Sequence, residues 1–415
     1  MTDSRPSSAL WFAETTWRGP LHAPFNAALL ETAARAFPDH PIVFAAEHAH
    51  GECVASHLSD GASRRIERVH LDQGPILPAW NGYRAGIAGA HPIARSRAAH
   101  RLLSVALRQR SGPKFLALTS VTADVLLGAL ALGVGRRAPK RIEAVIHGNL
   151  TEACGWRSRR PLWRALDLRS ALRYWTRRGH AITVLESHIV DELIAHDPGL
   201  ARPGRVHLLP HPIPEGPPGG LPQPVRGPIQ VGFLGAGTRA KGLDLFVEVA
   251  SRLHTRSDID FRICGFLPDS TLDIDQTPLR DRITTEPQGR EVYQRILAEL
   301  DYVCLPLRGD YYRWAASGTV LDAVTHLKPL ITLSCSATER LFDEAGDIGH
   351  LCEDPADLER TLVRLAEDRD DARYASQVRR LGALRDSRTP AALAGVMQSR
   401  WFDGDRGHEG DVKPD

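Results

Sequence analysis

The sequence predicts an α/β fold of two domains, each built on a parallel β-sheet with crossover helices. Short apolar runs of strand length alternate with helix-length patterns through both halves of the 415-residue chain. A stretch rich in proline and glycine, Gly216-Pro217-Pro218-Gly219-Gly220, interrupts this alternation. We therefore assign residues 1–215 to a first domain, 216–227 to a linker, 228–390 to a second domain, and 391–415 to a C-terminal helix and a disordered tail.

The predicted elements follow one another in a regular order. In the first half, strands are expected at 9–12, 42–46, 66–71, 115–119, 144–147, 181–185 and 206–209, with helices at 24–37, 96–108, 123–132 and 188–196. In the second half, strands are expected at 229–234, 261–264, near Ile283, and at 302–307, 330–333 and 350–352, with helices at 243–253, 292–300, 316–327, 339–345 and 358–366. Asp354 followed by Pro355 is a typical signal for the start of the last of these helices.

Composition and charge exclude several classes of function. Hydrophobic residues make up 42% of the chain and charged residues 25%, as in soluble globular proteins. Lys and Arg number 52 against 50 Asp and Glu, so no general attraction to nucleic acid is expected. The six cysteines form no CxxC pair, which argues against a zinc site or a disulfide framework. With no signal-peptide pattern and no run long enough to cross a bilayer, we expect a cytoplasmic protein.

Two stretches of the second half are typical of anion-binding sites. The loop after the strand at 229–234 carries Arg239 and Lys241, but its glycines fit neither the dinucleotide fingerprint nor a Walker A loop. The helix that begins near Ser317-Gly318-Thr319 has small and hydroxylated residues at its N-terminus, where backbone N–H groups bind phosphate. Taken alone, the loop with Arg239 and Lys241 is compatible with two solvated cations beside a turn. The stretch at Ser317, taken alone, is compatible with an ordinary capped helix. Together, at the carboxyl ends of parallel strands, they predict a ligand site.

Several segments of the second half occur in an order known from one family. They are Val231-Gly-Phe-Leu-Gly235, Lys241-Gly-Leu-Asp-Leu245, Phe261-Arg-Ile-Cys-Gly265, Leu300-Asp-Tyr-Val-Cys-Leu-Pro-Leu307, Ser317-Gly-Thr-Val-Leu-Asp-Ala323 and Lys328-Pro-Leu-Ile331. Over residues 228–370 this order resembles the donor domain of GT-B glycosyltransferases, particularly family 4. In the first half, His207-Leu-Leu-Pro-His211-Pro-Ile-Pro214 resembles the segment that leads into the interdomain linker.

The resemblance implies a fold of two Rossmann-like domains that face each other across a cleft. It further implies transfer of a sugar, with retention of configuration, from a nucleotide diphosphate sugar to a hydroxyl acceptor, within polysaccharide or glycolipid assembly. No cofactor beyond that donor substrate and no metal is expected. Asp322 would bind the ribose and belongs to the predicted catalytic residues. The predicted donor-binding residues of the second domain are Gly235, Arg239, Lys241, Ser317, Gly318 and Thr319.

The sequence departs from the family pattern at one position. The family has two glutamates eight positions apart, and here these positions hold Trp314 and Asp322. A tryptophan does not replace a carboxylate that orients the sugar, although Asp310 could do so from a shifted position. Two other functions therefore stay open: a non-catalytic GT-B-like binding protein, and a GT-B sugar-nucleotide epimerase.

In the first domain, the candidate residues follow the ends of predicted strands. Gly19 and His22 lie in a loop after the first strand, where GT-B proteins place a glycine-containing loop that faces the donor. His147 ends the strand at 144–147 and could position an acceptor hydroxyl or act as a base, since histidine titrates near neutral pH. A histidine satisfied in a turn is the alternative. Glu186 is a weaker candidate of the same type.

The segment Trp156–Arg178 combines aromatic and basic residues. Four aromatic residues (Trp156, Trp163, Tyr174 and Trp175) are interleaved with eight arginines, with Asp167 as the acidic residue among them. An amphipathic helix of this composition is suited to an interfacial membrane contact and to a lipid-linked acceptor, which would place the protein peripherally on the inner face of the membrane. The alternative is an exposed helix whose tryptophans pack inside. Nucleic acid is not expected as a partner.

Overall fold

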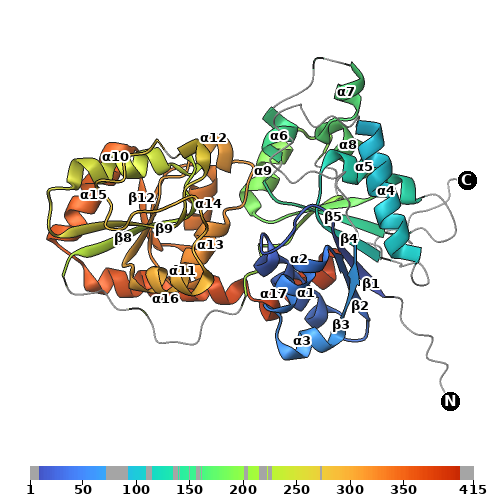
Figure 1. Cartoon of the computed structure of the whole chain (residues 1–415), viewed down its shortest axis with the longest axis horizontal. Helices are drawn as coiled ribbons and strands as arrows, with labels where there is room; N and C mark the ends of the chain where they lie inside the picture. The colour runs from blue at the N-terminus through green and yellow to red at the C-terminus, as the bar shows by residue number, and fades with distance from the viewer. Residues whose placement is uncertain are drawn as a thin grey trace, which may run out of the picture. The chain divides into compact units, whose positions relative to one another are not determined.

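The computed structural model describes residues 9–71, 92–108, 115–133, 139, 141–148, 150–155, 159, 161–200, 204–214, 222, 227–271 and 273–401. Its internal contacts divide the chain into two compact units. Unit 1 consists of Met1–Pro214 together with Arg388–Asp415, and unit 2 of Glu215–Ser387. Each unit has a central sheet flanked by helices (Figure 1). The predicted linker at 216–227 lies almost entirely outside the described residues, as does the tail beyond Trp401.

Unit 1 contains a seven-stranded sheet whose paired strands are all parallel, in the order β3-β2-β1-β4-β5-β6-β7. Its strands are β1 (Leu10–Glu14), β2 (Ile42–Ala46), β3 (Ile66–His70), β4 (Phe115–Ser120), β5 (Arg141–Ile146), β6 (Ala181–Val184) and β7 (Val206–Leu208). The inner strands are almost continuously buried because helices cover both faces of a parallel sheet. The direction of chain travel reverses between β1 and β4, which makes the carboxyl ends of these two strands the expected ligand position.

The helices of unit 1 connect these strands. They are α1 (Ala23–Ala36), α2 (His48–Ala55), α3 (Asp60–Arg65), α4 (Pro92–Arg108), α5 (Ala123–Leu130), the 3-10 turn η2 (Ala131–Gly133), α6 (Leu150–Gly155), α7 (Pro161–Ala165), α8 (Leu168–Arg177), α9 (Ser187–His196) and, from the end of the chain, α17 (Pro390–Trp401). Helix α1 is buried along nearly its whole length, and it packs against α17.

Unit 2 contains a five-stranded parallel sheet in the order β12-β11-β10-β8-β9. Its strands are β8 (Ile229–Ala236), β9 (Ile259–Phe266), β10 (Tyr302–Leu305), β11 (Leu330–Leu333) and β12 (Gly349–Cys352). Its helices are η3 (Arg239–Lys241), α10 (Leu243–Leu253), η4 (Asp269–Thr271), α11 (Arg290–Glu299), α12 (Gly309–Tyr312), α13 (Gly318–Thr325), α14 (Ser336–Ala345), α15 (Pro355–Glu367) and α16 (Asp371–Ser387). The order reverses between β8 and β10.

The structure confirms the predicted alternation of strands and helices and corrects some of its details. The strand expected near Ile283 does not form, because the Ile283 N–H donates to the Gln276 side chain (2.7 Å) and not to a strand. The basic-aromatic segment is not one helix, since α7 ends at Ala165 and Asp167 caps the separate helix α8 through the Ser170 N–H (2.8 Å). Helices α2, α3, α6, α12 and α16 were not predicted.

The C-terminal helix α17 is held in unit 1 by its last described residue. Trp401 is fully buried, with its ring centroid 5.4 Å from that of Phe115 and 6.0 Å from that of Phe12. Its indole N–H donates to the Thr183 hydroxyl (3.0 Å), which in turn donates to the buried carboxylate of Glu143 (2.6 Å). The ring therefore joins the end of the chain to the core of the first sheet.

We expect Trp401→Ala to destabilise unit 1 by about 3–5 kcal/mol, because a buried aromatic side chain leaves a cavity and the Thr183 hydroxyl loses a donor. Urea unfolding of the variant and the wild type measures the difference. Trp163→Ala is the matched control, since Trp163 is 39% exposed in α7. Equal unfolding midpoints for Trp401→Ala and the control would contradict the anchoring role of Trp401.

Candidate functional site

The site in unit 2 is built at the carboxyl end of β8, beside the point where the strand order reverses. Gly235 has a left-handed backbone (φ 77°), and a Cβ added to it would lie 2.7 Å from Thr319 Cγ2 and 3.2 Å from Lys241 Nζ. The two stretches predicted to bind an anion therefore meet at Gly235. A side chain at this position would fill the space between them.

The loop after β8 is shaped by hydrogen bonds within itself and by a second left-handed glycine. The Thr238 hydroxyl accepts from the Lys241 N–H (3.4 Å) and begins the 3-10 turn η3. Gly242 has φ 79°, and a Cβ there would overlap the backbone carbonyl of Pro306 after β10. Only glycine combines this backbone conformation with such a close approach. The loop is thus fixed against the end of β10.

Lys241 is the cation most directly placed at this point. Its side chain is half-buried, and within the described part of the chain its ammonium group forms no hydrogen bond or ion pair. Burial lowers the pKa of Lys241 to about 8, while the nearby Asp322 carboxylate partly opposes this shift. A poorly solvated cation of this kind is stabilised when an anion binds beside it.

Arg239 occupies a different environment from Lys241. Its guanidinium is 52% exposed and pairs with Asp273 at 2.8 Å, a surface ion pair that contributes little to stability. The sequence reasoning missed a further cation, Arg308, which follows β10. Arg308 donates to the Arg239 carbonyl (2.9 Å) and to Asp244 (2.6 Å), so it fixes the loop from the opposite side. Its position immediately after a predicted strand was the available signal.

The N-terminus of α13 opens beside this loop. The Ser317 hydroxyl caps the helix by accepting from the Val320 N–H (3.4 Å) and lies 3.2 Å from the Thr319 hydroxyl. A Cβ added to Gly318, which is exposed, would meet no described atom within 4 Å. The start of α13 is therefore open at Gly318, one residue before Thr319, whose side chain lies beside Gly235.

Asp322 lies one turn further along α13. Its carboxylate Oδ2 accepts a hydrogen bond from the Tyr293 hydroxyl of α11 (2.9 Å). Burial raises the pKa of Asp322, and the Tyr293 hydrogen bond, His326 and Lys241 oppose that rise. Tyr293 was not predicted, because α11 is remote from α13 in the sequence.

The position where the family has its first glutamate is part of the core. Trp314 is only 4% exposed, and the Arg313 guanidinium carbon lies 5.4 Å from its ring centroid. Asp310 is exposed at the start of α12, where its carboxylate accepts from the Tyr311 N–H (3.0 Å). The structure thus leaves Asp310 at the surface and places an aromatic ring where the resemblance leads one to expect a carboxylate.

In unit 1, Gly19 and His22 form the loop between β1 and α1. Both have left-handed backbones, with φ 58° for Gly19 and 61° for His22. The Gly19 carbonyl accepts from the His50 ring (2.8 Å), and the His22 ring stacks on Trp17 at 4.2 Å between centroids. A non-glycine residue in this conformation is unusual and marks a loop that its surroundings hold in place.

Three histidines gather at the carboxyl edge of the first sheet. His147 contacts His22 edge-on, with 4.7 Å between ring centroids, and it lies 6.5 Å from His211. Its Nε2 is 2.9 Å from the Thr119 carbonyl, which only accepts, so Nε2 carries the proton and Nδ1 is left as an acceptor. His211 was not predicted as a site residue, although it lies in the segment that leads into the linker.

Burial keeps these histidines neutral. It lowers the pKa of His147, and burial followed by the charge of a protonated His147 lowers the pKa of His22 well below 6.5 and that of His211 to about 4. Glu186 does not join them as a free carboxylate, since it forms two hydrogen bonds with the Arg388 guanidinium (2.6 and 2.9 Å). The edge of unit 1 thus presents neutral imidazoles, and Nδ1 of His147 can accept a hydrogen bond.

The described residues contain no group of His, Cys, Asp and Glu side chains that could hold a metal ion. Among the helices that the structure describes, none combines the length and the apolarity that a membrane crossing requires.

Comparisons with known proteins agree with the geometry. Residues 228–368 match the family described as glycosyl transferases group 1. No curated protein matches the chain. Three solved structures illustrate the likeness of fold. A glycosyltransferase from Rickettsia africae has 9% identity and a TM-score of 0.60, with 98% of this chain and 100% of that chain covered.

The second structure is a lipopolysaccharide outer core galactosyltransferase, with 12% identity, a TM-score of 0.56, and 95% and 99% of the two chains covered. The third is a mutant of S. aureus TarM in complex with fondaparinux, α-GlcNAc-glycerol and UDP, with 13% identity, a TM-score of 0.51, and 74% of this chain and 58% of that chain covered. The predicted fold of two Rossmann-like domains is confirmed. Residues 228–368 of unit 2 therefore match a glycosyl transferases group 1 domain, and the chain has the two-domain GT-B fold.

Proposed function

We propose that unit 2 binds a nucleotide diphosphate sugar and that the sugar is transferred to a hydroxyl group of the acceptor. The observation that carries this proposal is the meeting of Lys241 Nζ, Thr319 and the N-terminus of α13 around Gly235. A poorly solvated ammonium group and a helix N-terminus together neutralise the charge that develops on a departing diphosphate.

Each predicted residue has a role in this proposal. The backbone N–H groups and hydroxyls of Ser317, Gly318 and Thr319 bind phosphate oxygens or the sugar. Gly235 provides the space, and Asp322 accepts hydrogen bonds from the ribose. Arg239 would have to exchange its surface pairing with Asp273 for the diphosphate. The UDP present in the TarM structure makes UDP the first nucleotide to test.

Unit 1 is proposed to bind the acceptor. Neutral His147 has its Nδ1 available to accept a hydrogen bond from the acceptor hydroxyl, and the His22 loop lies beside it. The C1–O bond to the diphosphate breaks with its electron pair on the diphosphate, the acceptor oxygen bonds to C1, and the hydroxyl proton passes to a nearby base. We propose retention of configuration, which rests on the family resemblance.

A non-catalytic binding protein is the second candidate, because the buried Trp314 replaces a carboxylate of the family. The two candidates differ in turnover. A transferase releases UDP from a UDP-sugar when a hydroxyl acceptor is present, whereas a binding protein releases none under any condition.

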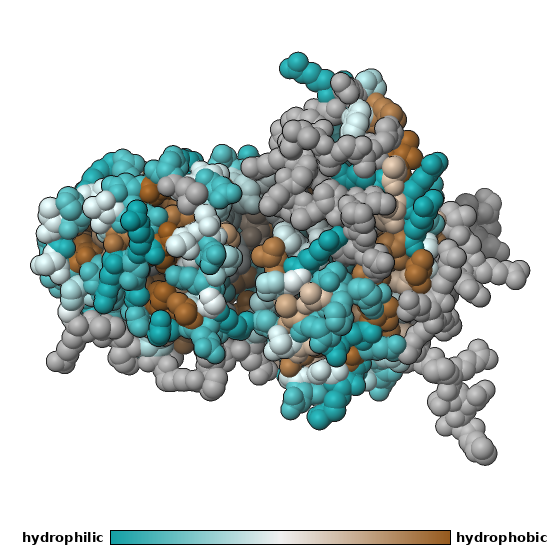
Figure 2. Space-filling view, in the orientation of Figure 1, coloured by the Kyte–Doolittle hydropathy of each residue, from teal (hydrophilic) through white to brown (hydrophobic). Residues whose placement is uncertain are grey.

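The proposal extends to membrane-associated polysaccharide or glycolipid assembly. All five residues of α7 are exposed, including Leu162 (52%) and Trp163 (39%), and Tyr174 of α8 is 41% exposed. Arg177 and Arg178 are exposed and form no ion pair in the described part of the chain, and with Tyr174 they line an open hollow of about 500 Å³ against α5. Figure 2 shows hydrophobic and hydrophilic residues side by side on this part of unit 1. Such a surface suits anionic lipid.

In the basic-aromatic segment Trp156–Arg178, one tryptophan packs inside the protein, as the alternative to a membrane contact predicts. Trp175 is fully buried and donates to the Ala181 carbonyl (2.8 Å). Arg169 and Arg173 pair with Asp197 at 2.6 and 3.0 Å. The proposed lipid contact is therefore limited to α7 and to the end of α8, and Trp156 lies outside the described residues.

The substitution Lys241→Ala is expected to weaken UDP binding by about 10- to 100-fold. The reason is that a hydrogen bond to a charged group contributes roughly 1.5–3 kcal/mol. Isothermal titration with UDP and other nucleoside diphosphates compares wild type, Lys241→Ala and the control Arg360→Ala, which removes an exposed cation of α15. If the wild type binds none of these nucleotides, the proposed function is wrong. If Lys241→Ala binds like the control, the donor site lies elsewhere.

The affinity for UDP is expected to fall as the pH rises above about 8. The lowered pKa of Lys241 means that the free protein loses this proton near pH 8, while diphosphate binds to the charged form. Binding at higher pH therefore requires proton uptake, and the affinity falls by up to about tenfold per pH unit. In Lys241→Arg, titrations between pH 7 and 9 should give a constant affinity, and a slope equal to that of the wild type would show that another group titrates.

Membrane contact is expected to depend on anionic lipid and on α7. The protein should float with vesicles of phosphatidylcholine and phosphatidylglycerol at low salt, less at physiological salt, and not with phosphatidylcholine alone. Trp163→Ala and the double variant Arg177→Glu/Arg178→Glu should each reduce flotation, while Arg360→Glu in unit 2 should not. No flotation at either salt concentration rejects the membrane contact.

A further inference from the structure

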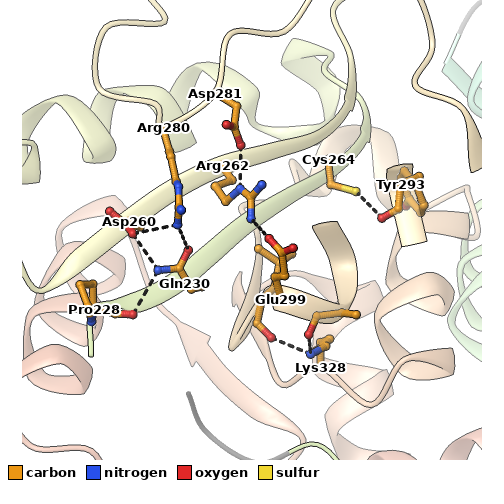
Figure 3. Close-up of polar contacts among 12 residues, drawn as sticks. Pro228, Gln230, Asp260, Arg262, Cys264, Arg280, Asp281, Tyr293, Glu299 and Lys328 are labelled. Atoms are coloured by element: carbon orange, nitrogen blue, oxygen red, sulfur yellow. Dashed lines mark hydrogen bonds and ion pairs between the residues drawn. The ribbon is translucent and has the colours of Figure 1, made fainter. Parts of the chain in front are cut away.

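Helix α11 is fixed at both of its ends, by two side chains of β9 and by Lys328 in the turn before β11. Near its start, the Cys264 thiol of β9 donates to the backbone carbonyl of Tyr293 (3.2 Å). At its end, Arg262 of β9 pairs with Glu299 (2.6 Å), and Lys328 donates to the carbonyls of Ala298 (2.8 Å) and Leu300 (2.6 Å). These contacts are drawn together in Figure 3. The helix thus has little freedom to rotate or slide against the sheet.

Because α11 is fixed in this way, it holds the side chain of Tyr293 in place against α13. Tyr293 donates its hydroxyl hydrogen to Asp322 Oδ2 (2.9 Å), and its backbone is the part of α11 that Cys264 holds. The hydroxyl is therefore positioned by the β9 strand on one side and directed at Asp322 on the other. Within the described residues, the Asp322 carboxylate accepts no other hydrogen bond, so its second oxygen, Oδ1, has no donor.

The hydrogen bond also acts on the charge of Asp322. Burial raises the pKa of the Tyr293 hydroxyl, so the tyrosine stays protonated and serves only as a donor here. Burial raises the pKa of Asp322 as well, and the Tyr293 hydrogen bond is the largest contribution that opposes this rise. An ionised carboxylate with one oxygen already bonded has its second oxygen directed to a ligand, whereas a protonated one does not accept two hydrogen bonds equally well.

We propose that Tyr293 is a positioning residue, which orients the Asp322 carboxylate so that its second oxygen accepts a hydroxyl hydrogen of the nucleotide ribose. This inference rests on the proposed donor site in unit 2. It adds a consequence that the donor site alone does not have: the protein discriminates ribonucleoside from 2′-deoxyribonucleoside diphosphates through the pair of Tyr293 and Asp322.

The test is a titration of UDP and 2′-deoxy-UDP into the full-length protein and the variant Tyr293→Phe, which keeps the ring. The wild type should prefer UDP by about 10- to 100-fold, the factor expected for a hydrogen bond to a charged group. Tyr293→Phe should bind UDP several-fold more weakly and 2′-deoxy-UDP almost unchanged, so that the preference shrinks. The UDP affinity of the variant should also fall more steeply than that of the wild type as the pH is lowered from 7 to 5, because Asp322 protonates more easily without the Tyr293 hydrogen bond.

Tyr374→Phe is the matched control. Tyr374 of α16 is buried and donates to the Asp301 carbonyl (3.3 Å), away from the site. Its loss should lower stability without changing the preference for UDP or the pH profile. Asp322→Asn is the second variant, and it keeps the test decisive if Tyr293→Phe does not fold, because Tyr293 acts only through Asp322. The preference should be lost in Asp322→Asn.

The outcomes separate this inference from the function on which it rests. The ratio of the affinities for UDP and 2′-deoxy-UDP is compared between the proteins. If the wild type binds UDP and this ratio is the same in Tyr293→Phe or in Asp322→Asn, the positioning role is overturned while the donor site stands. If the wild type binds neither nucleotide, both are overturned. A reduced preference in Tyr293→Phe together with the acid-sensitive affinity supports the role, because a purely structural contribution would change neither ratio nor pH profile.

Discussion

The site in unit 2 depends on the close approach of two backbones at Gly242. The left-handed conformation of this residue and the Pro306 carbonyl beside it leave no room for a Cβ. Because β8 and β10 are neighbours on either side of the reversal in strand order, this contact fixes the loop after one strand against the loop after the other. Lys241 precedes the glycine, and its position at the site follows from that contact.

The two candidate sites use burial in opposite ways. In unit 2, Lys241 and Asp322 are each poorly solvated, and each makes the charged form of the other more favourable. They form no hydrogen bond with each other, so both keep their capacity to bind a ligand. In unit 1, the neighbouring imidazoles make charge on one another unfavourable, and burial leaves His22, His147 and His211 neutral. A charged donor group and an uncharged hydroxyl acceptor match these two environments.

How much the sequence reveals depends on how local each feature is. Strand-to-helix alternation and the loops around Lys241 and Ser317 are local, and they were predicted with nearly the observed limits. Arg308, His211 and Tyr293 reach their sites through tertiary packing, and no short-range pattern shows that packing. The failed strand near Ile283 has the same cause, since an apolar residue was expected in a sheet while its N–H is satisfied by Gln276. Trp163 and Trp175 belong to two separate helices, α7 and α8, and they differ in burial for reasons that the periodicity of the sequence does not show.

Trp314 stands where the resemblance to family 4 implies a carboxylate, and the structure packs its ring into the core. A carboxylate at this buried position would lose most of its hydration, and the Arg313 guanidinium lies close enough to compensate part of that loss. In this protein the turn from Arg308 to Ser317 packs around an aromatic ring, beside the N-terminus of α13. In the proposed donor site, groups other than a carboxylate at position 314 would therefore have to hold the sugar.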